Sequence, residues 1–224
     1  MKGTRGYRLR MALAHAALVA MASAAGLAQA ADTADTETLV FVRHGEKPEQ
    51  GYGQLNCQGL NRSLALPAVV AAKFGKPDAI YAPSPAEQKL DDGKLYYYVR
   101  PLATIEPTAI QFGMPVQTPF GYSQIKELQR TLVSPANRGK LVVIAWEHRE
   151  IESLVRNIVN AYGAQAQKIP KWPSSDYDSI YVVKLHWQND VPHASFLHDT
   201  EGLDGRAADC PCAALPAGAS SPAH

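Results

Sequence analysis

Short runs of apolar residues alternate along the chain with longer stretches in which apolar residues recur every three or four positions. The short runs are rich in β-branched residues and predict buried strands, whereas the longer stretches predict amphipathic helices. Strands are expected at residues 38–42, 79–81, 115–118, 140–146, 179–185 and 194–197, and helices at 60–74, 102–112, 123–132 and 151–162. This alternation predicts an α/β fold, a three-layer α/β/α sandwich in which helices cover both faces of a mostly parallel central sheet.

Two stretches interrupt this pattern. Pro67 falls inside the first predicted helix and is expected to bend or restart it, because proline has no backbone N–H to donate. Residues 84–94 are polar and predict a loop. The sequence contains no internal repeat, and its length is sufficient for a single domain with a sizeable core.

The first thirty residues have the pattern of an export signal. A basic stretch ending at Arg10 precedes the apolar run 11–27, and Ala28-Gln29-Ala30 follows as a cleavage site with small residues at both ends. An uncleaved transmembrane anchor is the alternative, but no stop-transfer charges follow the apolar run. We therefore expect residues 1–30 to be a signal peptide that is cleaved near Ala31, and the mature protein to be secreted or periplasmic.

The domain organisation follows from this cleavage. Residues 31–204 contain all the predicted strands and helices and form one expected domain. The Ala-, Pro- and Ser-rich residues 205–224 are expected to be a disordered tail, because they contain too few large apolar side chains to pack.

Charge narrows the classes of partner. The whole chain has 22 Lys and Arg against 21 Asp and Glu, but Lys2, Arg5, Arg8 and Arg10 all lie in the signal, which has no acid. The mature chain is therefore slightly acidic. Nucleic acids and anionic membranes both require a basic surface, so neither is expected as a partner after cleavage. The sequence does not indicate an oligomeric state.

The chain contains three cysteines, Cys57, Cys210 and Cys212. In an oxidising compartment a disulfide between Cys57 and either Cys210 or Cys212 is expected, which leaves one thiol over. A zinc site would need more ligands at regular spacing, so no metal is expected here.

Two predicted strands end in a histidine. His44 follows the strand at 38–42 and lies between Arg43 and Gly45, and His148 follows the strand at 140–146. In sheets of this kind, sites lie at the carboxyl ends of the strands. A histidine that attacks phosphorus must be neutral at the attacking nitrogen and fixed at the other, and arginines can hold the transferred group. The alternative for His44 is a structural hydrogen-bonding role.

These residues, in this order, resemble the histidine phosphatase superfamily, whose fold is phosphoglycerate-mutase-like. The resemblance spans about residues 38–185. It is carried by the strand before Arg43-His44-Gly45-Glu46, by Leu55-Asn56-x-x-Gly59 at a helix start, by residues 78–85 (DAIYAPSP), by Arg100 with Thr104 and Thr108-Ala109, and by the strand that ends at His148.

The resemblance implies a set of roles. His44 would be transiently phosphorylated, Arg43 and Arg100 would hold the phosphoryl group, and His148 would hold its oxygen from the opposite side. The resemblance also implies a small phosphorylated substrate and no metal or cofactor.

The sequence departs from the family pattern at two places. The family usually places its second arginine soon after the Ser-Pro pair, whereas here residues 86–99 intervene before Arg100 and are interpreted as an insertion. Arg62 and Lys89 are the alternatives for this second clamp. The carboxylic acid that many members place after the third strand is also missing, so Glu147 and Glu150, which flank His148, are the candidates for the proton donor.

Together these features predict an exported phosphatase that cleaves phosphomonoesters through a phosphohistidine intermediate on His44. A mutase is less favoured, because glycolytic intermediates are cytosolic. The alternative from a different class is a catalytically silent protein on the same fold that binds phosphoryl groups or a partner.

Overall fold

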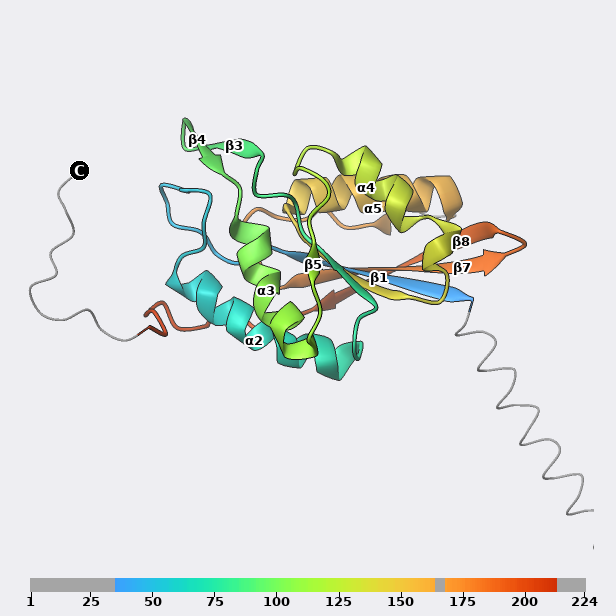
Figure 1. The fold of residues 1–224 in the computed structure, drawn as a ribbon, viewed down its shortest axis with the longest axis horizontal. Coiled ribbons are helices and arrows are strands. Elements are labelled where there is room, and N and C mark those ends of the chain that lie inside the picture. The colour runs from blue at the N-terminus through green and yellow to red at the C-terminus, as the bar shows by residue number, and fades with distance from the viewer. Residues whose placement is uncertain (1–34, 164–167, 213–224) are drawn as a thin grey trace, which may run out of the picture.

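The computed structural model describes residues 35–163 and 168–212 of the chain. A six-stranded sheet crosses the molecule in the order β5–β2–β6–β1–β7–β8 (Figure 1). The strands are β1 (Thr36–Arg43), β2 (Ala79–Tyr81), β5 (Val116–Gln117), β6 (Leu141–Trp146), β7 (Ser179–Gln188) and β8 (Val191–Thr200). Each of the six predicted strands is present, and the sequence placed all of them within a few residues of their bounds.

The sheet is mostly parallel, as predicted. β5, β2, β6 and β1 pair in parallel, whereas β7 pairs antiparallel with both β1 and β8. The parallel register of β1 with β6 sets Val40 opposite Val143 and Arg43 opposite Trp146. Both strands are nearly continuous apolar runs because each is covered on its two faces.

Two helices cover each face of the sheet (Figure 1). On one face, α2 (Cys57–Lys73) and α3 (Arg100–Phe112) pack Leu66, Val70 and Ile105 against the sheet. On the other face, α4 (Ile125–Leu132) and α5 (His148–Tyr162) complete the second core, and a short 3-10 turn (Pro135–Asn137) follows α4. The predicted three-layer α/β/α sandwich is thereby confirmed.

The expectation that Pro67 restarts its helix is wrong, because α2 continues as one helix from residue 57 to residue 73. Leu66 and Val70, on either side of the proline, are fully buried in the core. Their burial offsets the one backbone hydrogen bond that proline cannot make.

The predicted loop at 84–94 is also wrong in its second half. Residues there form a two-stranded hairpin of β3 (Gln88–Asp91) and β4 (Lys94–Tyr97) that pairs antiparallel. Asp92 and Gly93 make the turn, and both have positive φ, at 48° and 76°. Asp-Gly favours this two-residue turn because these residues tolerate the left-handed region. The hairpin stands beside the start of α3 (Figure 1).

The last described residues of the chain contact the first turns of α2. Cys57, the first residue of α2, forms a disulfide with Cys210, and Cys212 is an exposed free thiol. Asn61 Nδ2 donates to the carbonyl oxygens of Ala207 at 2.9 Å and Asp209 at 2.8 Å. These contacts hold residues 205–210, the start of the predicted tail, on α2. The rest of that tail from residue 213, and the predicted signal at 1–30, lie outside the described residues.

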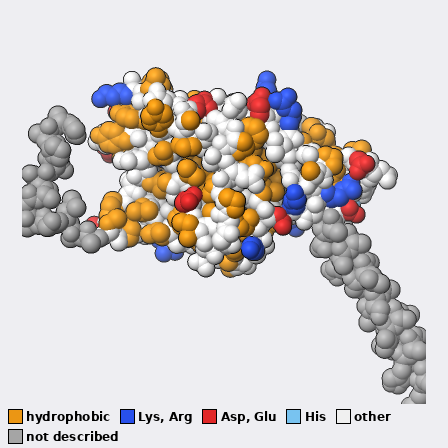
Figure 2. Space-filling view, in the orientation of Figure 1, with side chains coloured by type: hydrophobic (Ala, Val, Ile, Leu, Met, Phe, Trp, Pro, Cys, Tyr) orange, Lys and Arg blue, Asp and Glu red, His pale blue; other side chains and the backbone are white. Residues whose placement is uncertain are grey.

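One face of the molecule is seen in Figure 2, where hydrophobic side chains are spread across the surface and charged ones lie mostly around its edge. Lys and Arg lie beside Asp and Glu there rather than in one continuous stripe. Among the described helices, none is both long enough and apolar enough to cross a membrane.

Candidate active site

The candidate site lies where β1 and β6 end side by side. The backbone N–H of His44 donates to the carbonyl oxygen of Trp146 at 3.0 Å, which extends the parallel register by one residue beyond Arg43. Glu147 and His148 therefore follow β6 at the same edge of the sheet at which Arg43 and His44 follow β1. The strand topology thus brings together the two histidines that the sequence singled out.

The His44 side chain is held in one orientation. Its Nδ1 lies 2.8 Å from the carbonyl oxygen of Gly45, so Nδ1 carries the proton and donates. Burial, reinforced by the charge of Arg100, lowers the pKa of His44 well below its usual value. No described residue hydrogen-bonds to its Nε2. The ring is therefore neutral at pH 7, with its lone pair on the nitrogen that is free to react.

Glycines explain how the chain can turn so closely at this point. A Cβ on Gly45 would lie 2.9 Å from backbone atoms of Gly59, and a Cβ on Gly59 would lie 2.3 Å from the carbonyl oxygen of Glu46. Asn56 is the N-cap of α2, and its side chain accepts a hydrogen bond from Gly59 N at 2.8 Å. The Asn56-x-x-Gly59 motif therefore packs the helix start against the loop that carries His44.

Backbone carbonyl groups in the loop before β7 hold the side chain of Arg43. Its Nη1 donates to the carbonyl oxygens of Ser174 at 2.8 Å and Asp176 at 2.6 Å, and its guanidinium lies 3.8 Å from the ring centre of Tyr177. The residue is only 3% exposed, and its Nε is buried without a partner among the described residues. One side of the guanidinium fork is thus anchored and the other remains available for an anion.

Arg100 is the first residue of α3 and comes from a different element than Arg43. It is 3% exposed, and its Nη1 donates to the carboxylate of Asp91 and, at 3.3 Å, to the carbonyl oxygen of Gly51. Its guanidinium lies 4.9 Å from the ring centre of Tyr98, which in turn lies 6.0 Å from that of His44. After burial, the charge of Arg100 is the main cause of the lowered pKa of His44. Thr104, one turn along α3, accepts from Gly45 N at 2.9 Å and ties the helix to the histidine loop.

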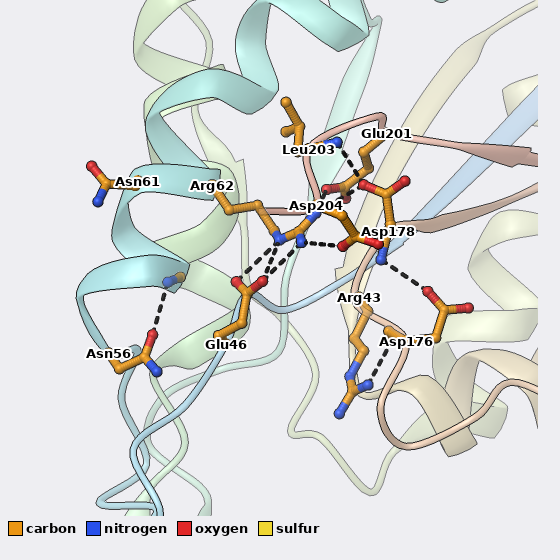
Figure 3. A network of polar contacts seen from close by, with 12 residues as sticks. Arg43, Glu46, Asn56, Asn61, Arg62, Asp176, Asp178, Glu201, Leu203 and Asp204 are labelled. Carbon is orange, nitrogen blue, oxygen red and sulfur yellow. Dashed lines mark hydrogen bonds and ion pairs between the residues drawn. The ribbon is translucent and has the colours of Figure 1, made fainter. Parts of the chain in front are cut away.

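Arg62, one alternative for the second clamp, is occupied elsewhere. It is fully buried and forms ion pairs with four carboxylates, as Figure 3 shows. The distances are 2.8 Å to Glu46, 3.1 Å to Asp178, 2.7 Å to Glu201 and 2.9 Å to Asp204. Arg62 therefore joins α2 to the segments around β7 and β8, and its guanidinium is not available to a substrate.

Lys89, the other alternative, is brought into the site by the β3–β4 hairpin. Its Nζ lies 4.9 Å from the ring centre of Tyr98 and 5.0 Å from that of Tyr122. Tyr98 is fully buried, and its ring centre lies 6.0 Å from that of His44 in a T-shaped arrangement. Tyr98 was not identified from the sequence as a residue of the site, because nothing in the local pattern indicates that its ring is buried beside His44.

The two carboxyl groups that flank His148, those of Glu147 and Glu150, differ in the direction of their pKa shift. Glu147 is the N-cap of α5, and its Oε2 accepts from Arg149 N at 2.8 Å and Glu150 N at 3.1 Å. Its Oε1 lies 2.9 Å from Nδ1 of His148. Although burial opposes ionisation, these contacts lower the pKa of Glu147 to about 2. Burial and the charge of Glu147 instead raise the pKa of Glu150.

The site therefore combines one neutral histidine with three cationic side chains. His44 presents a lone pair, whereas Arg43, Arg100 and Lys89 come from three different elements, β1, α3 and β3. Among residues 35–163 and 168–212, no group of three or more His, Cys, Asp or Glu is arranged to hold a metal ion. Chemically, this arrangement suits a tetrahedral dianion next to a nucleophilic nitrogen.

The site thus sets a neutral histidine and arginine side chains at the strand ends of a three-layer α/β/α sandwich. No protein-family model matches the chain, and no curated protein matches it. Among solved structures, the chain is similar to a phosphoglycerate mutase from Plasmodium falciparum, with 13% identity, a TM-score of 0.48, and coverage of 72% of this chain and 89% of the other.

Two further similar structures are mycobacterial. One is a glucosyl-3-phosphoglycerate phosphatase in complex with inorganic phosphate, with 12% identity, a TM-score of 0.46, and coverage of 71% of this chain and 95% of the other. The second is described as mycobacterial hydrolase 2, with 12% identity, a TM-score of 0.47, and coverage of 72% and 89%. At these levels of similarity, the functional argument rests on the residues of the site.

Proposed function

We propose that the protein is a phosphatase of the histidine phosphatase type, which hydrolyses phosphomonoesters through a phosphohistidine intermediate on His44. The observation that carries this proposal is the fixed tautomer of His44, whose Nδ1 donates to Gly45 and whose Nε2 is left unprotonated beside Arg43 and Arg100. A histidine in this state is ready to attack without first losing a proton.

The reaction would proceed in two steps. In the first step, Nε2 of His44 attacks phosphorus while the bond from phosphorus to the ester oxygen breaks, and the alcohol leaves after that oxygen takes up a proton. In the second step, water attacks the phosphohistidine and releases inorganic phosphate. Two easier displacements replace one difficult one, which is the general advantage of a covalent intermediate.

The arginines and His148 have separate roles in this scheme. Arg43 and Arg100 hold the phosphoryl oxygens from two sides, and each is oriented by hydrogen bonds from one end of its fork. His148, at the start of α5, would add a donor from the β6 side, and its Nδ1 lies 2.9 Å from Oε1 of Glu147. The positive end of the α5 dipole also favours a negatively charged group at this position.

Of the two carboxyls proposed as proton donors, Glu147 is unsuitable. With a pKa of about 2, it is ionised at every pH at which the protein would work, and both of its oxygens are already engaged. Glu150, whose pKa is raised, is the carboxyl that can hold a proton. Glu147, which lies next to His44 where β1 and β6 end, is therefore not the proton donor to the leaving group.

We also propose that the protein is exported and that its signal is removed near Ala31. The support comes from the sequence pattern of residues 1–30 and from the Cys57–Cys210 disulfide, since disulfides persist in oxidising compartments. N-terminal sequencing of periplasmic material tests the cleavage. A mature chain that retains residues 1–30 would contradict it.

The proposed activity is tested with the purified mature protein and an aryl phosphate. Turnover with release of inorganic phosphate is expected. Saturable binding of phosphate without turnover would instead support the silent phosphoryl-binding protein. Transfer of the phosphoryl group to a second hydroxyl compound, in place of release to water, would support the mutase.

A further inference from the structure

A groove adjoins the site and is not explained by phosphoryl binding alone. It has a volume of about 740 Å³ and lies between the first turns of α5 and residues 171–175 before β7. Two of its lining residues also belong to the site: His148, and Ser174, whose carbonyl oxygen anchors Arg43. A volume of this size accommodates an organic group much larger than a phosphoryl group.

The walls of the groove carry an excess of positive charge. Arg156 and Glu152 also line the groove, but they form an ion pair with each other at 3.1 Å. Arg156 also donates to the carbonyl oxygen of Ile169 at 2.7 Å, which holds the segment before β7 against α5. Arg149 and Lys171, which lie on opposite walls, make no side-chain hydrogen bond or ion pair with a described residue. Both are exposed and line the groove, so their charges are available to a molecule bound there.

We propose that this groove binds the leaving group of the substrate and that this leaving group carries a second anionic group, a carboxylate or a phosphoryl, held between Arg149 and Lys171. The proposal rests on the proposed phosphatase function, and it narrows the substrate from any phosphomonoester to one with a second negative charge at the far end of its leaving group. The phosphoryl group would occupy the space beside His44, while the remainder of the molecule extends past His148.

The test compares matched substrates. Phenyl phosphate, 4-carboxyphenyl phosphate and 1,4-phenylene bisphosphate present the same ring with and without a second anion. The wild-type protein is expected to prefer one or both anionic substrates in kcat/KM by at least about tenfold, the usual effect of one charge-assisted contact. In the double variant Arg149→Ala/Lys171→Ala this preference should fall to near one.

The control variant, Lys76→Ala/Lys126→Ala, removes the same charge from exposed positions outside the groove and should keep the preference. Equal kcat/KM for all three substrates, or a preference that survives the double variant, would overturn the inference while leaving the phosphatase function intact. Failure to hydrolyse any of the three substrates would instead count against the proposed function.

A second observation concerns the proton for the leaving group and comes from the hairpin. The ammonium of Lys89 is half-buried over the rings of Tyr98 and Tyr122, and it forms no hydrogen bond or ion pair with a described residue. The charged groups that act on it are Glu147, Arg100, Asp91 and Glu150. A cation held this close to the phosphoryl site, without a partner of its own, is available to the substrate.

We infer that Lys89 donates the proton to the leaving oxygen. As Nε2 of His44 bonds to phosphorus, the phosphorus–oxygen bond breaks, and the electron pair left on that oxygen takes a proton from the Lys89 ammonium, so that a neutral alcohol departs. The neutral amine then takes a proton from the water that attacks the phosphohistidine, which restores the ammonium. Burial lowers the pKa of Lys89, which makes its ammonium a stronger acid for the first of these transfers.

The dependence on the leaving group tests this role, which rests on the proposed function. An acid is needed most by a poor leaving group, so Lys89→Met should reduce phosphoenzyme formation from ethyl phosphate at least about tenfold more than from 4-nitrophenyl phosphate. Lys94→Met, on the exposed side of the same hairpin, is the control and should reduce neither. An equal reduction for both substrates would make Lys89 only a phosphate clamp and overturn the inference. A leaving-group-dependent loss in Glu150→Gln that is absent in Lys89→Met would assign the acid to Glu150.

Discussion

His44 Nδ1 donates to the carbonyl oxygen of Gly45, its own neighbour in the chain, at 2.8 Å. A carbonyl oxygen can only accept, so this contact fixes the tautomer without introducing a negative charge that would favour the imidazolium. The reactive nitrogen is therefore set by the backbone of the Arg43-His44-Gly45 turn itself. Its neutrality then follows from burial and from the neighbouring arginines.

The two arginines considered for the second clamp should behave differently when replaced. Arg100→Ala should lower kcat/KM about a hundredfold, since it removes a charge-assisted contact worth about 3 kcal/mol in the transition state. Arg100→Lys should not restore activity, because an ammonium cannot bind Asp91, Gly51 and a phosphoryl oxygen with the geometry of the guanidinium fork. Steady-state kinetics with an aryl phosphate provide the measurement.

Arg62→Met serves as the contrasting variant. It leaves four carboxylates without their shared cation, so we expect a loss in the free energy of unfolding of about 3 kcal/mol or more. Urea titration measures that loss, and the folded fraction should retain more activity than Arg100→Ala. The assignment of roles would be wrong if Arg62→Met were fully stable but inactive while Arg100→Ala kept wild-type kinetics.

The sequence alone was sufficient to predict the main sheet, because the apolar pattern that indicates each strand is local. The runs at 39–42 and 141–146 are apolar at every position, as expected of strands covered on both faces, and the histidines that follow them are adjacent because parallel strands end at one edge. The hairpin was missed because its strands are only four residues long and mix polar residues with exposed apolar ones such as Leu90 and Leu95, so that the Asp92-Gly93 turn was its main signal.

The role of Arg62 could not be predicted in the same way. Its partners Asp178, Glu201 and Asp204 lie more than 100 positions away along the chain, and nothing in the local sequence indicates that they meet. The same holds for Tyr98, whose burial depends on how the hairpin folds over His44. Contacts of this kind depend on the tertiary structure rather than on the local pattern.

Stability should depend on pH through Glu37, a fully buried residue of β1. Trp187 Nε1 donates to its carboxyl at 3.3 Å, and burial raises its pKa from 4.5 to about 8. The folded protein therefore holds this proton more tightly than the unfolded chain does. It follows that the free energy of unfolding falls as the pH rises between about 5 and 8.

Glu37→Gln keeps the shape and an acceptor for Trp187 but cannot ionise, so its stability should vary less with pH over that interval. Urea midpoints of both proteins at pH 5, 6, 7 and 8 give the comparison. Other groups that titrate in this range act equally on the two proteins. Parallel pH dependences would show that Glu37 does not titrate as described.

The cysteines differ in their expected effect on stability. Cys210→Ser removes the bridge to Cys57, which closes a loop with a sequence separation of 153 residues, and should lower the free energy of unfolding by about 2–5 kcal/mol. Cys212→Ser, which alters only the exposed free thiol, should behave as wild type. If Cys212→Ser is the destabilised variant instead, Cys57 pairs with Cys212 and the described connectivity is incorrect.

The phosphohistidine on His44 is the central claim, and rapid quench with a radiolabelled phosphate ester tests it most directly. Wild-type protein, denatured in alkali within the first turnover, should carry label in a form that is stable to alkali and labile to acid and that maps to the peptide containing His44. His44→Ala should show neither label nor turnover, while its circular dichroism remains that of the folded protein. Wild-type turnover in His44→Ala, or label on a different residue of the wild-type protein, would contradict the account.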